Sequence, residues 1–150
     1  MTSKAAVEEF LAEPALAVVG ASRGGKKFGN SILRALRANG YRVVPVHPEA
    51  PEIDGLKCAP SLSSLPERVG GVVLAVQPAV TEWVVHEARD AGIRKIWMQQ
   101  GAESPAAVRF CEENGISVVQ KECILMFLRE GPRFHRFHRF LRGLFGRLPR

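Results

Sequence analysis

The sequence predicts an α/β fold: a doubly wound, Rossmann-like sheet of five parallel strands, helices on both of its faces, and an amphipathic helix at the C-terminus. Two features predict this fold. Short apolar runs alternate with segments of helical periodicity, as in repeated strand–helix–strand units. Within the short runs, polar and apolar residues do not alternate, which is typical of strands buried on both faces of a parallel sheet. The 150 residues are enough for one domain of this kind.

The first strand, the first helix and the second strand follow one another closely. Residues 16–19 are a compact apolar run that ends at Gly20, and we expect them to form the first strand. Residues 28–38 have the spacing of an amphipathic helix, which an Asn-Gly pair ends. The expected apolar face of this helix consists of Phe28, Ile32, Leu33 and Leu36. The valine-rich residues 41–46 form the second strand.

The alternation resumes after a stretch rich in proline and serine. Residues 49–70 form that stretch, with a short excursion at 53–56 and a helical turn near 61–65. The remaining strands are expected over residues 72–76, 93–98 and 116–119. The helices between them are expected over residues 80–91 and 104–113, the second with a serine as its N-cap. Trp83 and Trp97 are expected to pack against the sheet.

A sheet of this kind binds ligands beyond the carboxyl ends of its strands, where the strand order reverses. The segment after the first strand, residues 20–30, combines glycines with basic side chains. Glycine lets the backbone approach a ligand closely, and free amides at a helix start attract phosphate. The Ser22 hydroxyl adds a further donor. The basic residues are Arg23, Lys26 and Lys27, and their charges suit an anionic ligand with several phosphates.

This loop does not match the best-known nucleotide-binding motifs. It lacks the GxxxxGK[ST] order of a P-loop, and its second glycine, Gly24, is too far from Gly20 for GxGxxG. A NAD site also requires an acid at the end of the second strand, where this chain has His47 and Pro48. A NAD(P)-binding module, or a small dehydrogenase-like enzyme, is therefore an alternative that the loop spacing weakens.

Five segments together resemble a known family. They are VVGASR (18–23), GN (29–30), GYRVVPVHP (40–48), WMQQGAES (97–104) and CILM (123–126). On these segments, and over about residues 10–128, the chain is similar to the stand-alone coenzyme A-binding proteins and to the N-terminal CoA-binding domain of the succinyl-CoA synthetase α subunit. The resemblance implies a site for CoA, or for an acyl-CoA, at the strand ends identified above.

The resemblance also implies which residues bind the ligand. Residues 20–23 match the segment that holds the CoA phosphates, residues 46–48 flank the adenosine, and residues 76–78 match the loop that closes over the nucleotide. Together with the first loop, the expected binding residues are Gly20, Ala21, Ser22, Arg23, Lys26, Lys27, Asn30, Val46, His47, Pro48, Val76, Gln77 and Pro78. The chain departs from the family where Gln100-Gly101 replaces a Pro-Gly pair. Nothing corresponds to the synthetase's second domain with its phosphorylated histidine, so ligase chemistry is not implied.

No catalytic group is identified. His47 could act as an acid or base, but a hydrogen bond to ligand phosphate or ribose is favoured, because no carboxylate is identifiable to orient its ring. Glu103 is interpreted as a charge at a helix N-terminus. Cys58, Cys111 and Cys123 are interpreted as packing residues, with a mixed disulfide between Cys123 and the CoA thiol as the alternative. No metal site is expected. The prediction is a CoA-binding carrier or sensor without catalysis of its own.

The net charge of +6 lies entirely in the last part of the chain. Residues 129–150 hold seven arginines and one acid, whereas residues 1–128 are balanced. We therefore predict a CoA-binding domain over 1–128 and a cationic tail over 129–150. Residues 133–148 place phenylalanine and leucine on one side of a helix and most arginines on the other. This helix is expected to dock on the domain or on a second subunit of a homo-oligomer. The next candidate is an anionic membrane surface, and nucleic acid is the last. An interaction protein whose cationic tail contacts a membrane or a partner is therefore a second alternative function.

The sequence also predicts the compartment. Its N-terminus lacks the basic-then-apolar layout of a secretory signal, and no apolar run is long enough to span a bilayer. The three cysteines have neither the number nor the spacing of a disulfide framework or a zinc site. We therefore expect the chain in the cytoplasm.

Overall fold

The predicted parallel sheet is confirmed in a computed structural model, which describes residues 2–128. The sheet contains β1 (Ala15–Val19), β2 (Arg42–Val46), β5 (Gly71–Leu74), β6 (Lys95–Gln99) and β7 (Ser117–Glu122). Its strand order is β2-β1-β5-β6-β7, and every neighbouring pair is parallel. The chain runs from β1 outward to β2 and then returns to the other side of β1 as β5. The strand order therefore reverses between β1 and β5, which is where such sheets bind ligands.

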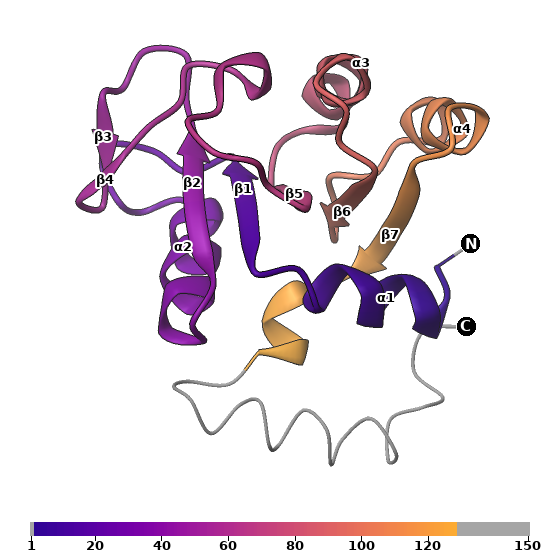
Figure 1. Cartoon of the computed structure of the whole chain (residues 1–150), viewed down its shortest axis with the longest axis horizontal. Coiled ribbons are helices and arrows are strands. Elements are labelled where there is room, and N and C mark those ends of the chain that lie inside the picture. Colours follow the sequence, from indigo (N-terminus) through magenta and orange to yellow (C-terminus); the bar gives the residue numbers. More distant parts are fainter. Residues whose placement is uncertain (1, 129–150) are drawn as a thin grey trace.

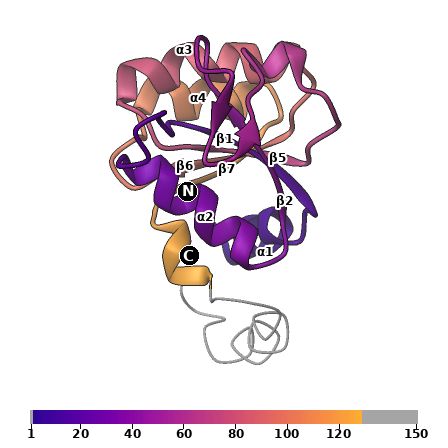
Figure 2. The same cartoon turned by 90° about the vertical axis from the view of Figure 1, so that its left-hand side faces the viewer.

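Helices cover both faces of the sheet, as expected. On one face lie α1 (Lys4–Leu11), α2 (Phe28–Ala38) and the 3-10 helix η2 (Ile124–Phe127). On the other face lie α3 (Pro78–Asp90), α4 (Pro105–Glu113) and the 3-10 helix η1 (Leu62–Ser64). Figures 1 and 2 show these two layers above and below the strands. No helix in this part of the chain is long and apolar enough to span a membrane. The helix expected over residues 133–148 lies outside the described residues.

The helix α1, at the start of the chain, is not among the elements expected from the sequence. Ser3 begins this helix, because its hydroxyl accepts a hydrogen bond from the Ala6 amide. Val7, Phe10 and Leu11 then bury one face of the helix in the core. The signal was present as a serine cap followed by apolar residues at helical spacing, although the segment was interpreted only for targeting.

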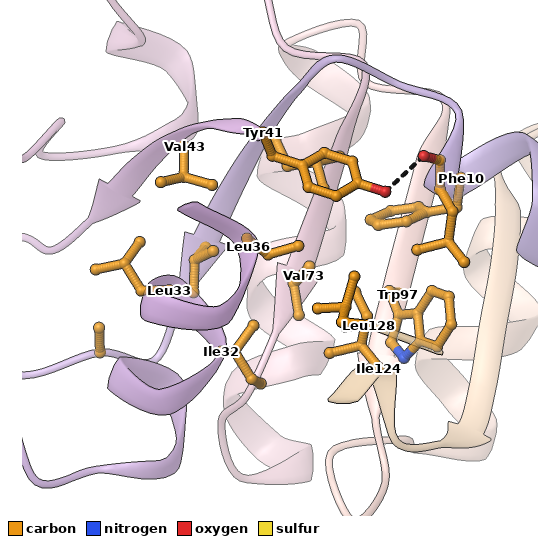
Figure 3. Packing of buried hydrophobic residues seen from close by; sticks show 14 of the residues in the cluster. Phe10, Ile32, Leu33, Leu36, Tyr41, Val43, Val73, Trp97, Ile124 and Leu128 are labelled. Carbon is orange, nitrogen blue, oxygen red and sulfur yellow. Dashed lines mark hydrogen bonds between the residues drawn. The ribbon is translucent and has the colours of Figure 1, made fainter. Parts of the chain in front are cut away.

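The core on the α1 and α2 side is organised around Trp97 (Figure 3). Its ring is fully buried and meets Phe10 and Phe127 edge-on, with ring centroids 5.4 and 5.5 Å away. Its indole Nε1 donates a hydrogen bond to the Glu122 carbonyl oxygen at 3.1 Å. Nearby, the Tyr41 hydroxyl donates to a backbone carbonyl of α1 at 2.7 Å, and burial raises the pKa of Tyr41 to about 12. The expected packing of Trp97 is confirmed.

The same expectation was wrong for Trp83, whose side chain is 74% exposed. The face of α3 that meets the sheet carries Thr81, Val85 and Ala88, at the spacing i, i+4 and i+7. Trp83 projects from the opposite side of the helix. The sequence was ambiguous here because α3 carries apolar residues on more than one face.

A small hairpin occupies the stretch between β2 and β5. It consists of β3 (Glu52–Ile53) and β4 (Leu56–Lys57), an antiparallel pair. The turn between them, Asp54-Gly55, has positive φ at both residues, +50° and +78°. This is the geometry of a two-residue type I′ turn, for which Asp-Gly is a preferred sequence. The expected excursion near residues 53–56 is thus a defined hairpin, and η1 confirms the helical turn expected near 61–65.

Candidate functional site

A cavity of about 540 Å³ opens at the carboxyl ends of β1, β5 and β6, next to the point where the strand order reverses. The segments that follow these three strands line it, together with the first residues of α2 and α3. Five of the expected binding residues line the cavity: Gly20, Lys27, Val76, Gln77 and Pro78. Its size and its position at the switch point are those of a ligand site.

Two glycines, Gly20 and Gly29, allow close contact between backbone segments next to the cavity. Gly20 has φ of +124°, and a Cβ atom there would lie 2.2 Å from the Ala75 carbonyl oxygen. At Gly29, in the first turn of α2, a Cβ atom would lie 2.4 Å from the Gly20 carbonyl carbon. The backbones after β1 and β5 and the start of α2 therefore touch one another directly. Only glycine permits this approach, because any Cβ would overlap backbone atoms.

Two helices begin at the cavity without side-chain caps. Lys27 and Gln77 are the N-cap residues of α2 and α3, and neither side chain accepts a hydrogen bond from its helix. In contrast, Ser3 and Ser104 cap α1 and α4 through their hydroxyls. The positive dipole ends of α2 and α3 thus remain available to a ligand, although Pro78 has no amide hydrogen and the amides of Asn30 and Val80 donate to backbone carbonyl oxygens. Two such helix starts beside a lysine favour an anion.

Asn30 holds the first loop in shape instead of facing the cavity. Its side chain is fully buried, and its Oδ1 accepts from the Ser22 amide at 2.8 Å and from the Ser22 hydroxyl at 3.3 Å. Its Nδ2 donates to the Ser22 carbonyl oxygen at 2.9 Å and to Asp54 Oδ2 at 3.2 Å. Asn30 and Ser22 therefore fix each other, and the hydrogen-bonding groups of the Asn30 amide are occupied within the protein.

The other expected residues of this loop lie around the cavity rather than on its wall. Arg23 and Lys26 are exposed side chains, and Ala21 is buried under the loop. None of the three lines the cavity. Long basic side chains on an exposed loop can still reach an anion that extends out of a cavity.

The residues expected after β2 lie at the same edge of the sheet, one strand from Gly20, outside the cavity. Val46 is buried and pairs with Ala59 in an isolated bridge, and His47 donates its amide to the Ala59 carbonyl oxygen at 2.9 Å. Pro48 is exposed. His47 Nδ1 accepts from the amides of the two residues after Pro48, at 3.0 and 2.9 Å. Its ring is therefore oriented by backbone, and Nε2 is the nitrogen left for a ligand.

The cavity also contains residues that were not in the expected binding set. Phe28 was expected in the apolar face of α2, but it is 50% exposed and lines the cavity, because it is the first residue of the helix. Val80 of α3 lines the opposite side. Gln99, the last residue of β6, and Gly101, which follows the strand, also line the cavity. They lie at the carboxyl end of a strand, where sheets of this kind bind ligands. An exposed aromatic side chain beside a cluster of glycines is a signal that could have identified Phe28.

Glu103 acts on this last segment. Its carboxylate accepts a hydrogen bond from the Gly101 amide at 2.8 Å, where Gly101 has φ of +94°. Gln99 Oε1 accepts from the Ile124 amide at 3.0 Å and ties the end of β6 to η2. Ser104 donates to a carboxylate oxygen of Glu82 and joins the starts of α4 and α3. These contacts set the shape of the cavity wall.

The thiols of Cys58 and Cys111 are not activated. Burial, reinforced by the Glu112 carboxylate, raises the pKa of Cys111 to about 12. Burial, with Glu52 adding to it, also raises the pKa of Cys58. Both thiols therefore stay protonated near neutral pH and are poor nucleophiles. Among residues 2–128, no three His, Cys, Asp or Glu side chains gather as a metal site would require.

Comparison with known proteins identifies the family. The family model described as "CoA binding domain" matches residues 15–129. Acetate–CoA ligase [ADP-forming] II of Archaeoglobus fulgidus is 37% identical over 81 residues, which are 53% of this chain but 12% of that protein. The uncharacterized protein YneT of Bacillus subtilis is 28% identical over 123 residues, 81% of this chain and 91% of its own length.

Among solved structures, a conserved hypothetical protein from Pyrococcus furiosus is 43% identical and superimposes with a TM-score of 0.71. It covers 75% of this chain and 97% of its own. The chain thus aligns with almost the whole length of some relatives and with a small part of a much longer ligase. On the match over residues 15–129, this chain belongs to the CoA-binding domain family.

Proposed function

We propose that this chain binds coenzyme A, free or acylated, as a cytoplasmic carrier or sensor, and does not itself convert it. One coincidence carries the proposal. The match to the CoA-binding family spans the strand ends that enclose the cavity, and that cavity has two uncapped helix starts and Lys27 in its wall. CoA is a polyanion with a diphosphate and a ribose phosphate, the kind of ligand that such a wall attracts.

The proposed roles of the residues follow from their places. The diphosphate lies against the turn at Gly20 and the positive dipole end of α2, with Lys27 as its counter-charge. The adenosine extends along the same edge of the sheet towards His47, whose Nε2 hydrogen-bonds ribose or phosphate. Residues 76–78 cover the nucleotide from the β5 side. A NAD site requires an acidic residue at the end of β2, where this chain has His47 and Pro48. This difference favours CoA over NAD.

The side chains near the site also support binding without turnover. His47 Nδ1 is occupied by two backbone amides rather than by a carboxylate that would activate the ring. The thiols of Cys58 and Cys111 have raised pKa values. All three cysteines are free, which suits the reducing compartment that we propose.

CoA is expected to stabilise the protein against heat. At a concentration one hundred times its Kd, a ligand that binds only the folded state adds about 2.7 kcal/mol to the free energy of unfolding. For a chain of this size, that gain raises Tm by about 5–10 °C. A thermal melt with CoA, and with NADH as the control that shares the adenosine diphosphate, checks this. A rise with NADH and none with CoA would overturn the proposed function.

Lys27 and Lys26 form a matched pair for testing the anion site. Both side chains are exposed, but only Lys27 lines the cavity. Lys27→Gln is expected to raise the Kd for CoA about tenfold at low salt, because it removes a charge-assisted contact to phosphate. Lys26→Gln is expected to change the Kd by less than about threefold, since a charge that does not line the cavity acts on the phosphate only through screening solvent. Calorimetric titration of both variants measures this, and equal losses would contradict the placement of phosphate beside Lys27.

A further inference from the structure

The turn of the small hairpin contacts two side chains of α2, and both of these side chains also hold the first loop. Asp54 Oδ2 accepts from Asn30 Nδ2 at 3.2 Å and from Arg34 at 3.1 Å. Asn30 holds Ser22 on both backbone groups, and Arg34 also donates to the Gly25 carbonyl oxygen at 3.2 Å. One carboxylate oxygen is thus shared by the two side chains that fix the loop at Ser22 and Gly25.

The turn is itself fixed in place. Arg37 donates to the Asp54 carbonyl oxygen at 3.2 Å, so α2 holds both the backbone and the side chain of this residue. The Asp54 side chain is 21% exposed, and a Cβ atom at Gly25 would lie 3.5 Å from its Oδ1. The carboxylate is therefore packed against the loop rather than free in solvent.

A carboxylate in this position needs an explanation if the loop binds phosphate. A negative charge beside an anion site repels the ligand, so on charge alone Asp54 should weaken binding. Its hydrogen bonds act in the opposite direction. By accepting from Nδ2, Asp54 reinforces the orientation of the Asn30 amide that the two backbone groups of Ser22 also select, with Oδ1 towards the Ser22 amide.

We propose that Asp54 is a positioning residue for the anion site: through Asn30 and Arg34 it holds residues 22–25 in the conformation that receives the ligand phosphates. The proposal rests on the proposed function, which it deepens by assigning a role to the hairpin. It predicts that loss of the acceptor oxygen at this position weakens the binding of an anion, although a negative charge is lost with it. A role as a simple charge predicts tighter binding instead, so the two roles differ in sign.

The variants are chosen so that the turn survives. Asp54→Gly removes the carboxylate and suits the positive φ at this position, and Asp54→Asn keeps an oxygen acceptor without the charge. Glu52→Gln is the matched control, because it removes an equal charge from an exposed position of the same hairpin. Amide hydrogen exchange of the free proteins and calorimetric titration with CoA are measured on all four chains.

In Asp54→Gly, the amides of Ser22 and Gly25 are expected to exchange about tenfold faster while core amides are unchanged, and the Kd for CoA is expected to rise about tenfold. Asp54→Asn is expected to restore both values to within about threefold of the original chain, and Glu52→Gln to leave both unaltered. Unchanged loop exchange, or equal or tighter CoA binding by Asp54→Gly, would overturn the positioning role. If the original chain does not bind CoA but the loop amides respond as expected, the proposed function fails and the structural link to the loop stands.

Discussion

Gly20→Ala is expected to lower the free energy of unfolding by about 3–5 kcal/mol. The same substitution is expected to abolish CoA binding. Two costs add at this position. The backbone has φ of +124°, which a side chain makes unfavourable, and the new Cβ would lie 2.2 Å from the Ala75 carbonyl oxygen. The Ala75 oxygen belongs to the backbone directly after β5, so it cannot move away as the end of a flexible side chain can. Relief requires the backbones after β1 and β5 to separate where both line the cavity.

Gly92→Ala separates these two costs. Gly92 also has positive φ, +79°, but a Cβ there meets nothing within 4 Å. This control is expected to lose about 1–2 kcal/mol, the cost of the backbone conformation alone. Urea unfolding followed by circular dichroism gives both values, and titration with CoA gives the effect on binding. Equal losses in the two variants would show that the close approach of Gly20 to Ala75 contributes nothing.

The parallel sheet was predictable because its strands carry their own evidence. Runs such as Val72 to Leu74 are apolar at every position, and each of these residues is completely buried between the two helical layers. The glycine-rich segment after β1 likewise predicted a tightly approaching backbone, although the predicted neighbour was a ligand, whereas Gly20 and Gly29 approach backbone atoms of the protein itself. These inferences need only neighbouring residues, so a sequence contains them.

The roles of individual side chains in the site were less predictable, because they depend on contacts between distant segments. Asn30 was expected to bind the ligand, but its side-chain amide hydrogen-bonds Ser22 and Asp54 within the protein. Its partner Asp54 lies 24 positions further along the chain, in the small hairpin. No local sequence pattern predicts that this hairpin contacts α2. The same is true of His47, whose Nδ1 is occupied only because the chain turns back at Glu49 and Ala50.

Helix faces were predictable only where the apolar stripe is unique. In α2, Ile32, Leu33 and Leu36 are completely buried as expected, whereas Phe28 lies at the helix start and is free to face the cavity. In α3, a tryptophan is the largest apolar side chain, yet it lies on the solvent side. Size and hydrophobicity therefore did not decide burial there; the buried face of the helix is the one that carries Thr81, Val85 and Ala88.

Trp97→Ala is expected to cost about 3–5 kcal/mol of unfolding free energy, the range for removing a large buried aromatic side chain. The ring is fully buried, both edge-on aromatic contacts are lost, and the Glu122 carbonyl oxygen loses its donor. Trp97→Phe keeps a ring in the stack and is expected to cost less, about 1–3 kcal/mol, mostly for the unpaired carbonyl.

The chain supplies its own control, because it has two tryptophans and they occupy opposite environments. Trp83→Ala is expected to change the free energy of unfolding by no more than about 0.5 kcal/mol, since the side chain is 74% exposed. Urea unfolding followed by circular dichroism measures both variants without relying on tryptophan fluorescence. A loss of several kcal/mol in Trp83→Ala would mean that its side of α3 is covered in solution. A small loss in Trp97→Ala would contradict a core built around this ring, and with it the anchoring of η2 beside the end of β6.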